Sequence, residues 1–215
     1  MQYQLSISGF HYDLVRNHLF PGDNLEAVAV ALCGRLSNNR IHKLLVQEVV
    51  YIPYSECQRT PDFISWQTER IAPLVEKAAK YNYAVVKIHC HPGGYEQFSS
   101  LDDDSDTRLF SSVFGWTDSD SPHGSCVMLP DGRIFGRVFF PDLETESITR
   151  ITVAGDNIKI WDYTGNANDQ LEIGKRTIQA FGEGTRLSIL KSFFSILFFN
   201  DGTLKRIILQ LNALL

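Results

Sequence analysis

The stretch VVKIHCHPGGYEQFSSLDDDSD (residues 85–106) joins an apolar strand pattern to the start of a helix and places two histidines at the junction. Residues 83–91 form a short, β-branched run of the kind that becomes a buried strand. Side chains two positions apart in a strand share a face, so His89 and His91 point the same way and Cys90 points the opposite way. Two imidazoles aimed at one point are a natural half of a zinc site.

A helix is predicted at residues 100–116, after a loop that contains Gly93 and Gly94. The glycine pair eases a turn, so the loop can fold back over the end of the strand. Acidic residues suit the first turn of a helix, and one of them, Asp102, lies eleven positions after the second histidine. Two histidines and one aspartate leave the fourth tetrahedral position of zinc open, which is typical of catalytic rather than structural zinc.

Two further residues are candidates for the chemistry that such an ion supports. Zinc lowers the pKa of a bound water to about 7, and a nearby carboxylate can then act as a general base. Glu26 follows a turn and begins an apolar segment that must pack inside, which makes it the candidate base. Ser99, three residues before Asp102, is a candidate hydrogen-bond donor to an oxyanion.

Each of these features also has a purely structural explanation. Packed or surface histidines often produce an H-x-H pattern, an aspartate run is usually a solvated helix start, and Glu26 alone would pass as a carboxylate at a strand edge. Asp103 and Asp104 are interpreted as part of the helix start. Asp106, one helical turn after Asp102, either supports the site or serves only that start.

Strand and helix patterns alternate along the rest of the chain up to about residue 162. We expect strands at 3–9 and 43–53, turn-linked strand pairs at 124–140 and 148–162, an apolar segment at 24–36, and helices at 10–20 and 60–80. In the second of these helices, Thr60 is the expected cap and Pro61 a first-turn residue.

Composition excludes several classes of function. The net charge of -5 gives no electrostatic basis for binding nucleic acid or an anionic membrane. The four cysteines contain no C-x-x-C pair, which favours reduced thiols in a cytoplasmic protein over a zinc ribbon or a disulfide framework. No signal peptide is expected, and the most apolar segment, 187–199, is too short to span a bilayer and carries Lys191.

The histidines, Ser99 and Asp102 also form a complete motif. His89 and His91, seven residues, Ser99, two residues and Asp102 spell H-x-H-x7-S-x2-D, with Glu26 upstream. This pattern resembles the JAMM metalloproteases, also called the JAB or MPN+ domain. The resemblance makes the two histidines and Asp102 zinc ligands, Glu26 the general base and Ser99 the oxyanion stabiliser.

The resemblance covers residues 1–162 and implies an α/β fold, a mixed, curved β-sheet flanked by helices and similar to cytidine deaminases. The family often has Ser or Thr where this chain has Cys90, a difference that affects packing only if the side chain points away from the metal. The implied activity is that of a zinc-dependent isopeptidase or peptidase, which cleaves after the C-terminus of a ubiquitin-like protein in deconjugation or precursor maturation. A non-catalytic MPN-type scaffold and a hydrolase of a small amide or sulfur-carrier conjugate are the alternatives.

The C-terminal part of the chain carries a second resemblance. Residues 163–175 read as a linker, and 176–215 as a short appendage that is similar to the opening of an E1-like (ThiF-type) adenylating domain. Its N-D-G-T loop has one glycine where G-x-G-x-x-G is expected, so no nucleotide site is predicted. A hairpin or helix that simply completes the fold is the alternative. The resemblance implies a bacterial ubiquitin-like conjugation system, with E1-like and E2-like enzymes as partners.

Overall fold

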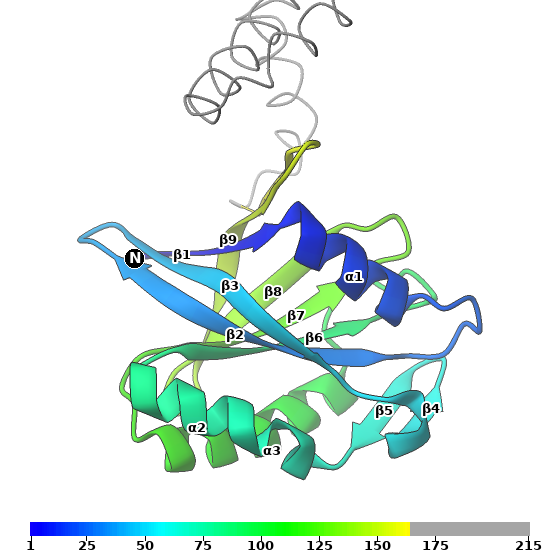
Figure 1. Ribbon diagram of the computed structural model, residues 1–215, viewed down its shortest axis with the longest axis horizontal. Helices are drawn as coiled ribbons and strands as arrows, with labels where there is room; N and C mark the ends of the chain where they lie inside the picture. The colour runs from blue at the N-terminus through cyan, green and yellow to red at the C-terminus, as the bar shows by residue number, and fades with distance from the viewer. Residues whose placement is uncertain (164–215) are drawn as a thin grey trace, which may run out of the picture. The chain divides into compact units, whose positions relative to one another are not determined.

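A mixed, eight-stranded sheet organises residues 1–163, the part of the chain that the computed structural model describes (Figure 1). The elements follow one another as β1 (Gln2–Ser8), α1 (Gly9–Leu19), β2 (Val28–Ser37), β3 (Ile41–Tyr51), β4 (Cys57–Thr60), β5 (Phe63–Trp66), α2 (Ala72–Tyr81), β6 (Ala84–Cys90), α3 (Ser100–Thr117), β7 (His123–Met128), β8 (Ile134–Phe139), β9 (Thr145–Ala154) and β10 (Lys159–Asp162). The predicted α/β class is therefore confirmed. The predicted appendage at 176–215, and the linker beyond residue 163, lie outside the described residues.

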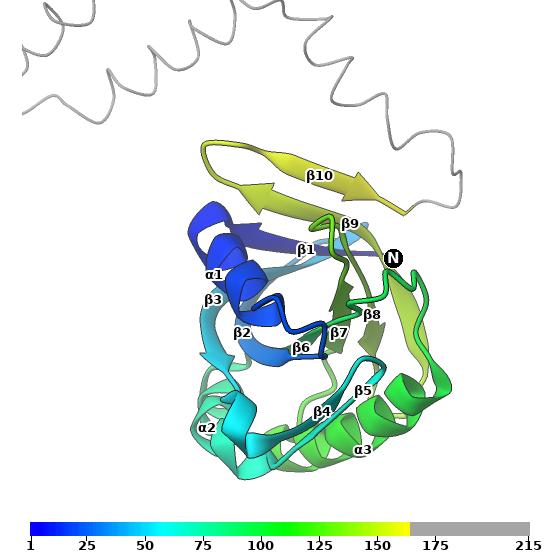
Figure 2. The ribbon, with the colours of Figure 1, turned by 90° about the vertical axis from the view of Figure 1, so that its right-hand side faces the viewer.

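The sheet is strongly curved. Its strand order is β1-β3-β2-β6-β7-β8-β9-β10, and β1 also pairs with β9, so the sheet closes on itself. The β1–β3, β1–β9 and β6–β7 pairs are parallel and the others are antiparallel. The closed sheet wraps partly around α1, while α2 and α3 lie together on its other side (Figure 2). No helix among the described residues is long and apolar enough to cross a membrane.

Alternation along β6 divides its side chains between two cores. Val86, Ile88 and Cys90 join the core that packs against α1, whereas Val85 joins the core that packs against α2 and α3. The Cys90 thiol accordingly donates to the carbonyl of Leu19 at 3.0 Å. The prediction that this cysteine points away from the histidines is confirmed, and the odd-numbered positions of β6 face α3.

The predicted helix at 60–80 is wrong in its first half. Thr60 ends β4 rather than capping a helix, and a turn leads from it into β5. Residues 63–66 pair antiparallel with β4, and the buried Ile64 is followed by the exposed Ser65, as expected where a strand has one covered face. The three-to-four-residue spacing that forms α2 begins only with the buried side chains Ile71, Leu74, Val75 and Ala78.

His123, at the start of β7, is a fully buried histidine that belongs to the core and not to the site. Its Nδ1 accepts a hydrogen bond from the backbone N–H of Val85 at 2.9 Å, and its ring lies against Phe110 and Phe114. Burial, aided by the positive charge of Arg35, lowers the pKa of His123 from 6.5 to about 3. The folded protein therefore keeps this imidazole neutral.

We expect this histidine to make the fold sensitive to acid. In the unfolded chain His123 takes up a proton near pH 6.5, whereas in the folded chain it does not. The contribution of His123 to the free energy of unfolding is therefore fully present above pH 6.5 and is lost as the pH is lowered towards 3. By pH 5 the loss from this residue is about 2 kcal/mol. Urea unfolding with chelator present, at pH 7 and pH 5, measures it. His123→Asn is less stable at pH 7, yet loses about 2 kcal/mol less on acidification. An equal acid loss in both proteins would contradict this account.

Candidate metal centre

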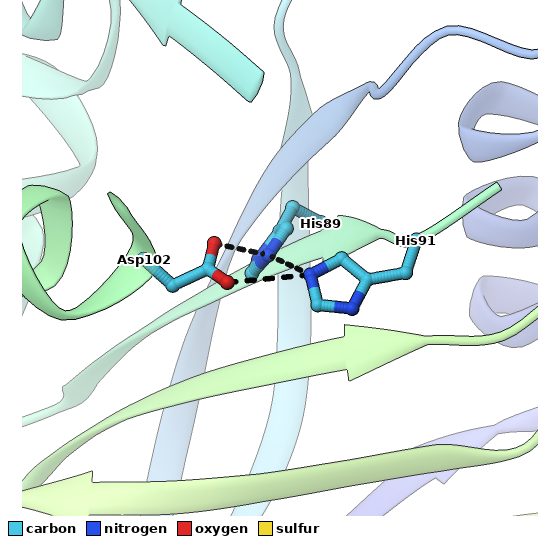
Figure 3. Close-up of side chains that lie close together, drawn as sticks. All are labelled: His89, His91 and Asp102. Atoms are coloured by element: carbon cyan, nitrogen blue, oxygen red, sulfur yellow. Dashed lines mark hydrogen bonds and ion pairs between the residues drawn. The ribbon is translucent and has the colours of Figure 1, made fainter. Parts of the chain in front are cut away.

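The end of β6 and the start of α3 bring the three predicted ligands together. His89 lies on the face of β6 that looks towards α3, and His91 follows directly after the strand. The backbone N–H of His91 donates to the carbonyl of Met128 in neighbouring β7, at 3.1 Å, which fixes the chain where the strand ends. Asp102 is the third residue of α3 and is buried. The side chains converge on one point, as predicted (Figure 3).

The spacing of the donor atoms fits a metal ion. The Nε2 atoms of His89 and His91 are 3.2 Å apart, and they lie 2.8 Å and 3.3 Å from the two carboxylate oxygens of Asp102. Ligands about 2.0–2.1 Å from a tetrahedral ion are about 3.3 Å from one another. Two nitrogens and one oxygen, all buried and within 4.8 Å of one another, therefore form a group that can hold a metal ion.

The ring of His91 is oriented by a backbone carbonyl. Its Nδ1 lies 2.7 Å from the oxygen of Tyr95 and donates to it, so Nε2 is the ring nitrogen that remains to bind a metal. Burial lowers the pKa of His91, but its hydrogen bonds with Asp102 and Tyr95 outweigh burial and raise it. The Nδ1 of His89 is buried and has no hydrogen-bond partner among the residues described. Burial and the positive charge of Lys87 lower the pKa of His89.

Asp102 is held by Ser99 in a capping box at the start of α3. The backbone N–H and the hydroxyl of Ser99 donate to Oδ2 of Asp102 at 2.8 Å and 2.7 Å, and the Ser99 hydroxyl accepts from the Asp102 N–H at 3.2 Å. Burial alone would raise the pKa of Asp102, but hydrogen bonds from the two imidazoles hold it far below its usual range. Ser99 thus positions a ligand, which S-x-x-D spacing signals and our sequence reasoning missed. Its oxyanion role remains a prediction.

Glu26 reaches the same site from the segment before β2. Its side chain is buried, and its carboxylate lies 3.9 Å from Nε2 of His91. Burial raises the pKa of Glu26 to about 7, with His91 opposing the rise and Asp102 adding to it. A carboxyl group that titrates near neutral pH can both accept and return a proton.

Arg59 in β4 braces the backbone that carries Glu26. Its guanidinium donates to the carbonyls of Leu25 and Glu26 at 3.1 Å and 2.5 Å, and it pairs with Asp23 at 2.9 Å. The backbone N–H of Glu26 donates to the carbonyl of Thr60, also at 2.9 Å. The sequence carries no sign of this brace, because its pattern from Thr60 onward predicts a helix.

The aspartates after Asp102 differ in their surroundings. Asp103 on the first turn of α3 and Asp104 directly after it are exposed, as predicted for a helix start, although Asp103 also pairs with Arg137 at 2.5 Å. Asp106 is fully buried and pairs with Lys87. Of the two explanations left open for Asp106, burial argues against the solvated helix start.

A family model matches the part of the chain that holds the site. The sequence model of a family described as prokaryotic homologs of the JAB domain matches residues 11–129, which include Glu26, both histidines, Ser99 and Asp102. No curated protein matches the chain. Among solved structures, the solution structure of protein DSY2949 from Desulfitobacterium hafniense matches with 13% identity and a TM-score of 0.44, over 72% of this chain and 94% of that one. The chain belongs to the prokaryotic JAB-domain family, as its motif predicted.

Proposed function

We propose that the protein is a zinc-dependent isopeptidase or peptidase that cleaves after the C-terminus of a ubiquitin-like protein. One observation carries the proposal. A buried His-His-Asp group that can hold a metal ion lies beside a buried glutamate whose pKa is raised to about 7. Scaffold domains need no such pairing of a metal site with a general base.

Zinc suits the donor set better than other common ions. His89 and His91 offer imidazole nitrogen and Asp102 a carboxylate oxygen, whereas magnesium and calcium prefer oxygen ligands alone. Three protein ligands leave a position for water or substrate. Bound there, zinc would polarise the scissile carbonyl and lower the pKa of a water molecule to about 7.

The chain's own residues then move the protons and hold the ligands. Glu26 takes a proton from the attacking water and returns it to the nitrogen of the leaving amine. Ser99 keeps Asp102 in place through its backbone N–H, which leaves the hydroxyl able to turn towards the oxyanion. The carbonyl of Tyr95 keeps the ring of His91 oriented. No side chain forms a covalent bond to the substrate.

The choice of a ubiquitin-like substrate rests on sequence. The complete motif and the membership of the JAB family support it, and so does the resemblance of residues 176–215 to the opening of an E1-like domain. Together they favour a bacterial, cytoplasmic conjugation system in which E1-like and E2-like enzymes are partners. The negative net charge agrees with a protein partner rather than nucleic acid or an anionic membrane.

A substrate panel tests the proposal. Ubiquitin-like proteins are joined through their C-termini to a reporter protein, or by an isopeptide bond to a lysine peptide, and small amides serve as the third arm. We expect cleavage after the ubiquitin-like C-terminus, loss of cleavage with a chelator, and recovery on addition of zinc. The fusion and isopeptide arms separate maturation from deconjugation. Cleavage that survives the chelator would refute the mechanism. Cleavage of small amides alone would favour a hydrolase of small conjugates. Binding of a ubiquitin-like protein without cleavage would favour a non-catalytic scaffold.

A further inference from the structure

A buried lysine lies next to the candidate metal centre. Lys87 is only 2% exposed and lies two residues before His89, on the face of β6 that looks towards α3. Its ammonium nitrogen is 2.7 Å from Oδ1 of Asp106, which is fully buried. The mechanism uses neither residue, and two charged groups at this depth need a reason to be there.

The Lys87–Asp106 pair repeats the arrangement of the His89–Asp102 pair. Lys87 lies two residues before His89 in β6, and Asp106 lies four residues after Asp102 in α3. The pairs His89–Asp102 and Lys87–Asp106 both bridge β6 and α3, at 2.8 Å and 2.7 Å. Residues i and i+2 of a strand are separated by about 6.7 Å, and residues i and i+4 of a helix by about 6 Å along its axis. Because these spacings nearly match, both ion pairs can form together in a single register of α3 against β6.

A third charged residue anchors the pair to the rest of the site. Arg137 of β8 donates to the other oxygen of Asp106 at 2.8 Å. Its guanidinium lies 3.9 Å from the ring centroid of Phe98, the residue before Ser99. The carboxylate of Asp106 is thus held from two strands, while the loop that leads into α3 packs on the same arginine.

His89 depends on such placement more than His91 does. Metal-binding histidines are usually oriented by a hydrogen bond from their second ring nitrogen. His91 has this bond to Tyr95, whereas Nδ1 of His89 has no partner in the part of the chain that the structure describes. The orientation of His89 towards Asp102 therefore comes from the position of its strand against α3.

We propose that the ion pair of Lys87 and Asp106 is a positioning device that sets the register of β6 against α3 so that His89 and Asp102 can bind one metal ion. The inference rests on the proposed function only in requiring a metal at the three donors. Lys87 and Asp106 contact neither metal nor substrate in this account.

Removing the charges of both Lys87 and Asp106 distinguishes an effect on ligand positioning from an effect on the stability of the fold. Lys87→Met with Asp106→Leu replaces the buried pair by apolar side chains, a change that often leaves a protein as stable or more so. We expect a melting temperature no more than about 5 °C below that of the wild type. Zinc affinity, measured by chelator competition, falls by about 10–100-fold, and the visible spectrum of bound cobalt(II) changes. The matched control is Lys77→Met with Glu48→Gln, which removes an exposed ion pair of the same 2.7 Å length between α2 and β3 and leaves zinc affinity unchanged.

A second variant keeps the test decisive if the double variant does not fold. Asp106→Glu retains every charge and lengthens the bridge by one methylene, so positioning predicts zinc affinity at least about 10-fold weaker. A folded double variant, or Asp106→Glu, that binds zinc as tightly as the wild type would overturn this inference and leave the proposed function standing. A wild-type protein that binds no zinc would overturn both.

Discussion

Glu26→Gln is expected to abolish cleavage of a ubiquitin-like substrate while leaving zinc bound. The glutamine has the same size and still accepts a hydrogen bond, but it cannot take a proton from water. Loss of a positioned general base lowers kcat by about 10²–10⁴-fold. Glu26 lies 3.9 Å from His91 and is not one of the three metal ligands. Zinc affinity therefore changes by no more than about threefold, which is a smaller change than the loss of a residue that orients a ligand would cause.

Steady-state kinetics and chelator competition on the same preparation measure both quantities. The control is Glu56→Gln, an exposed glutamate paired with Arg70, which keeps full activity. A Glu26→Gln protein that retains more than a tenth of the wild-type kcat would rule out this residue as the base. Parallel loss of zinc and activity would instead make Glu26 a ligand.

Asp102→Asn is expected to remove the metal itself. A structural zinc ion with four ligands is bound by about 10–16 kcal/mol, so each ligand accounts for roughly 3 kcal/mol, or at least about 100-fold in affinity. Asparagine keeps a side-chain oxygen that can accept from the N–H of Ser99, so the capping box is weakened rather than lost and α3 is destabilised by no more than about 1 kcal/mol. Cleavage at limiting zinc therefore falls to background in a folded protein.

The neighbouring aspartates make this test specific. Asp104→Asn changes an exposed residue in the same turn of α3, and we expect it to keep wild-type zinc affinity and activity. Zinc affinity by chelator competition and circular dichroism of both variants provide the comparison. Equal zinc affinity in Asp102→Asn and wild type would assign the third ligand elsewhere.

The residues of the metal centre could be predicted because local strand and helix geometry determines on which face each side chain lies. Strand alternation alone puts His89 and His91 on one face and Cys90 on the other, and the structure agrees. Choosing Asp102 among four nearby aspartates needed the family spacing, since any residue in the first turn of a helix benefits from its dipole. Burial then separates the ligand from Asp103 and Asp104.

Contacts between distant segments could not be predicted. Arg59 braces the segment of Glu26 through a hairpin that resembled a helix start in sequence, because Thr-Pro occurs in both contexts. Nothing near Lys87 in the sequence signals its burial, since its partner Asp106 lies nineteen positions on and approaches only through the packing of α3. Ser99 is a different case. Its capping box with Asp102 is a local pattern that the S-x-x-D spacing is enough to predict.

Anomalous diffraction from a zinc-soaked crystal, collected on both sides of the zinc absorption edge, tests the central claim most directly. We predict one strong peak bounded by Nε2 of His89, Nε2 of His91 and the carboxylate of Asp102, about 2.0–2.2 Å from each atom, with Glu26 outside the coordination sphere. An empty site under saturating zinc, or a peak held by other residues, would contradict it.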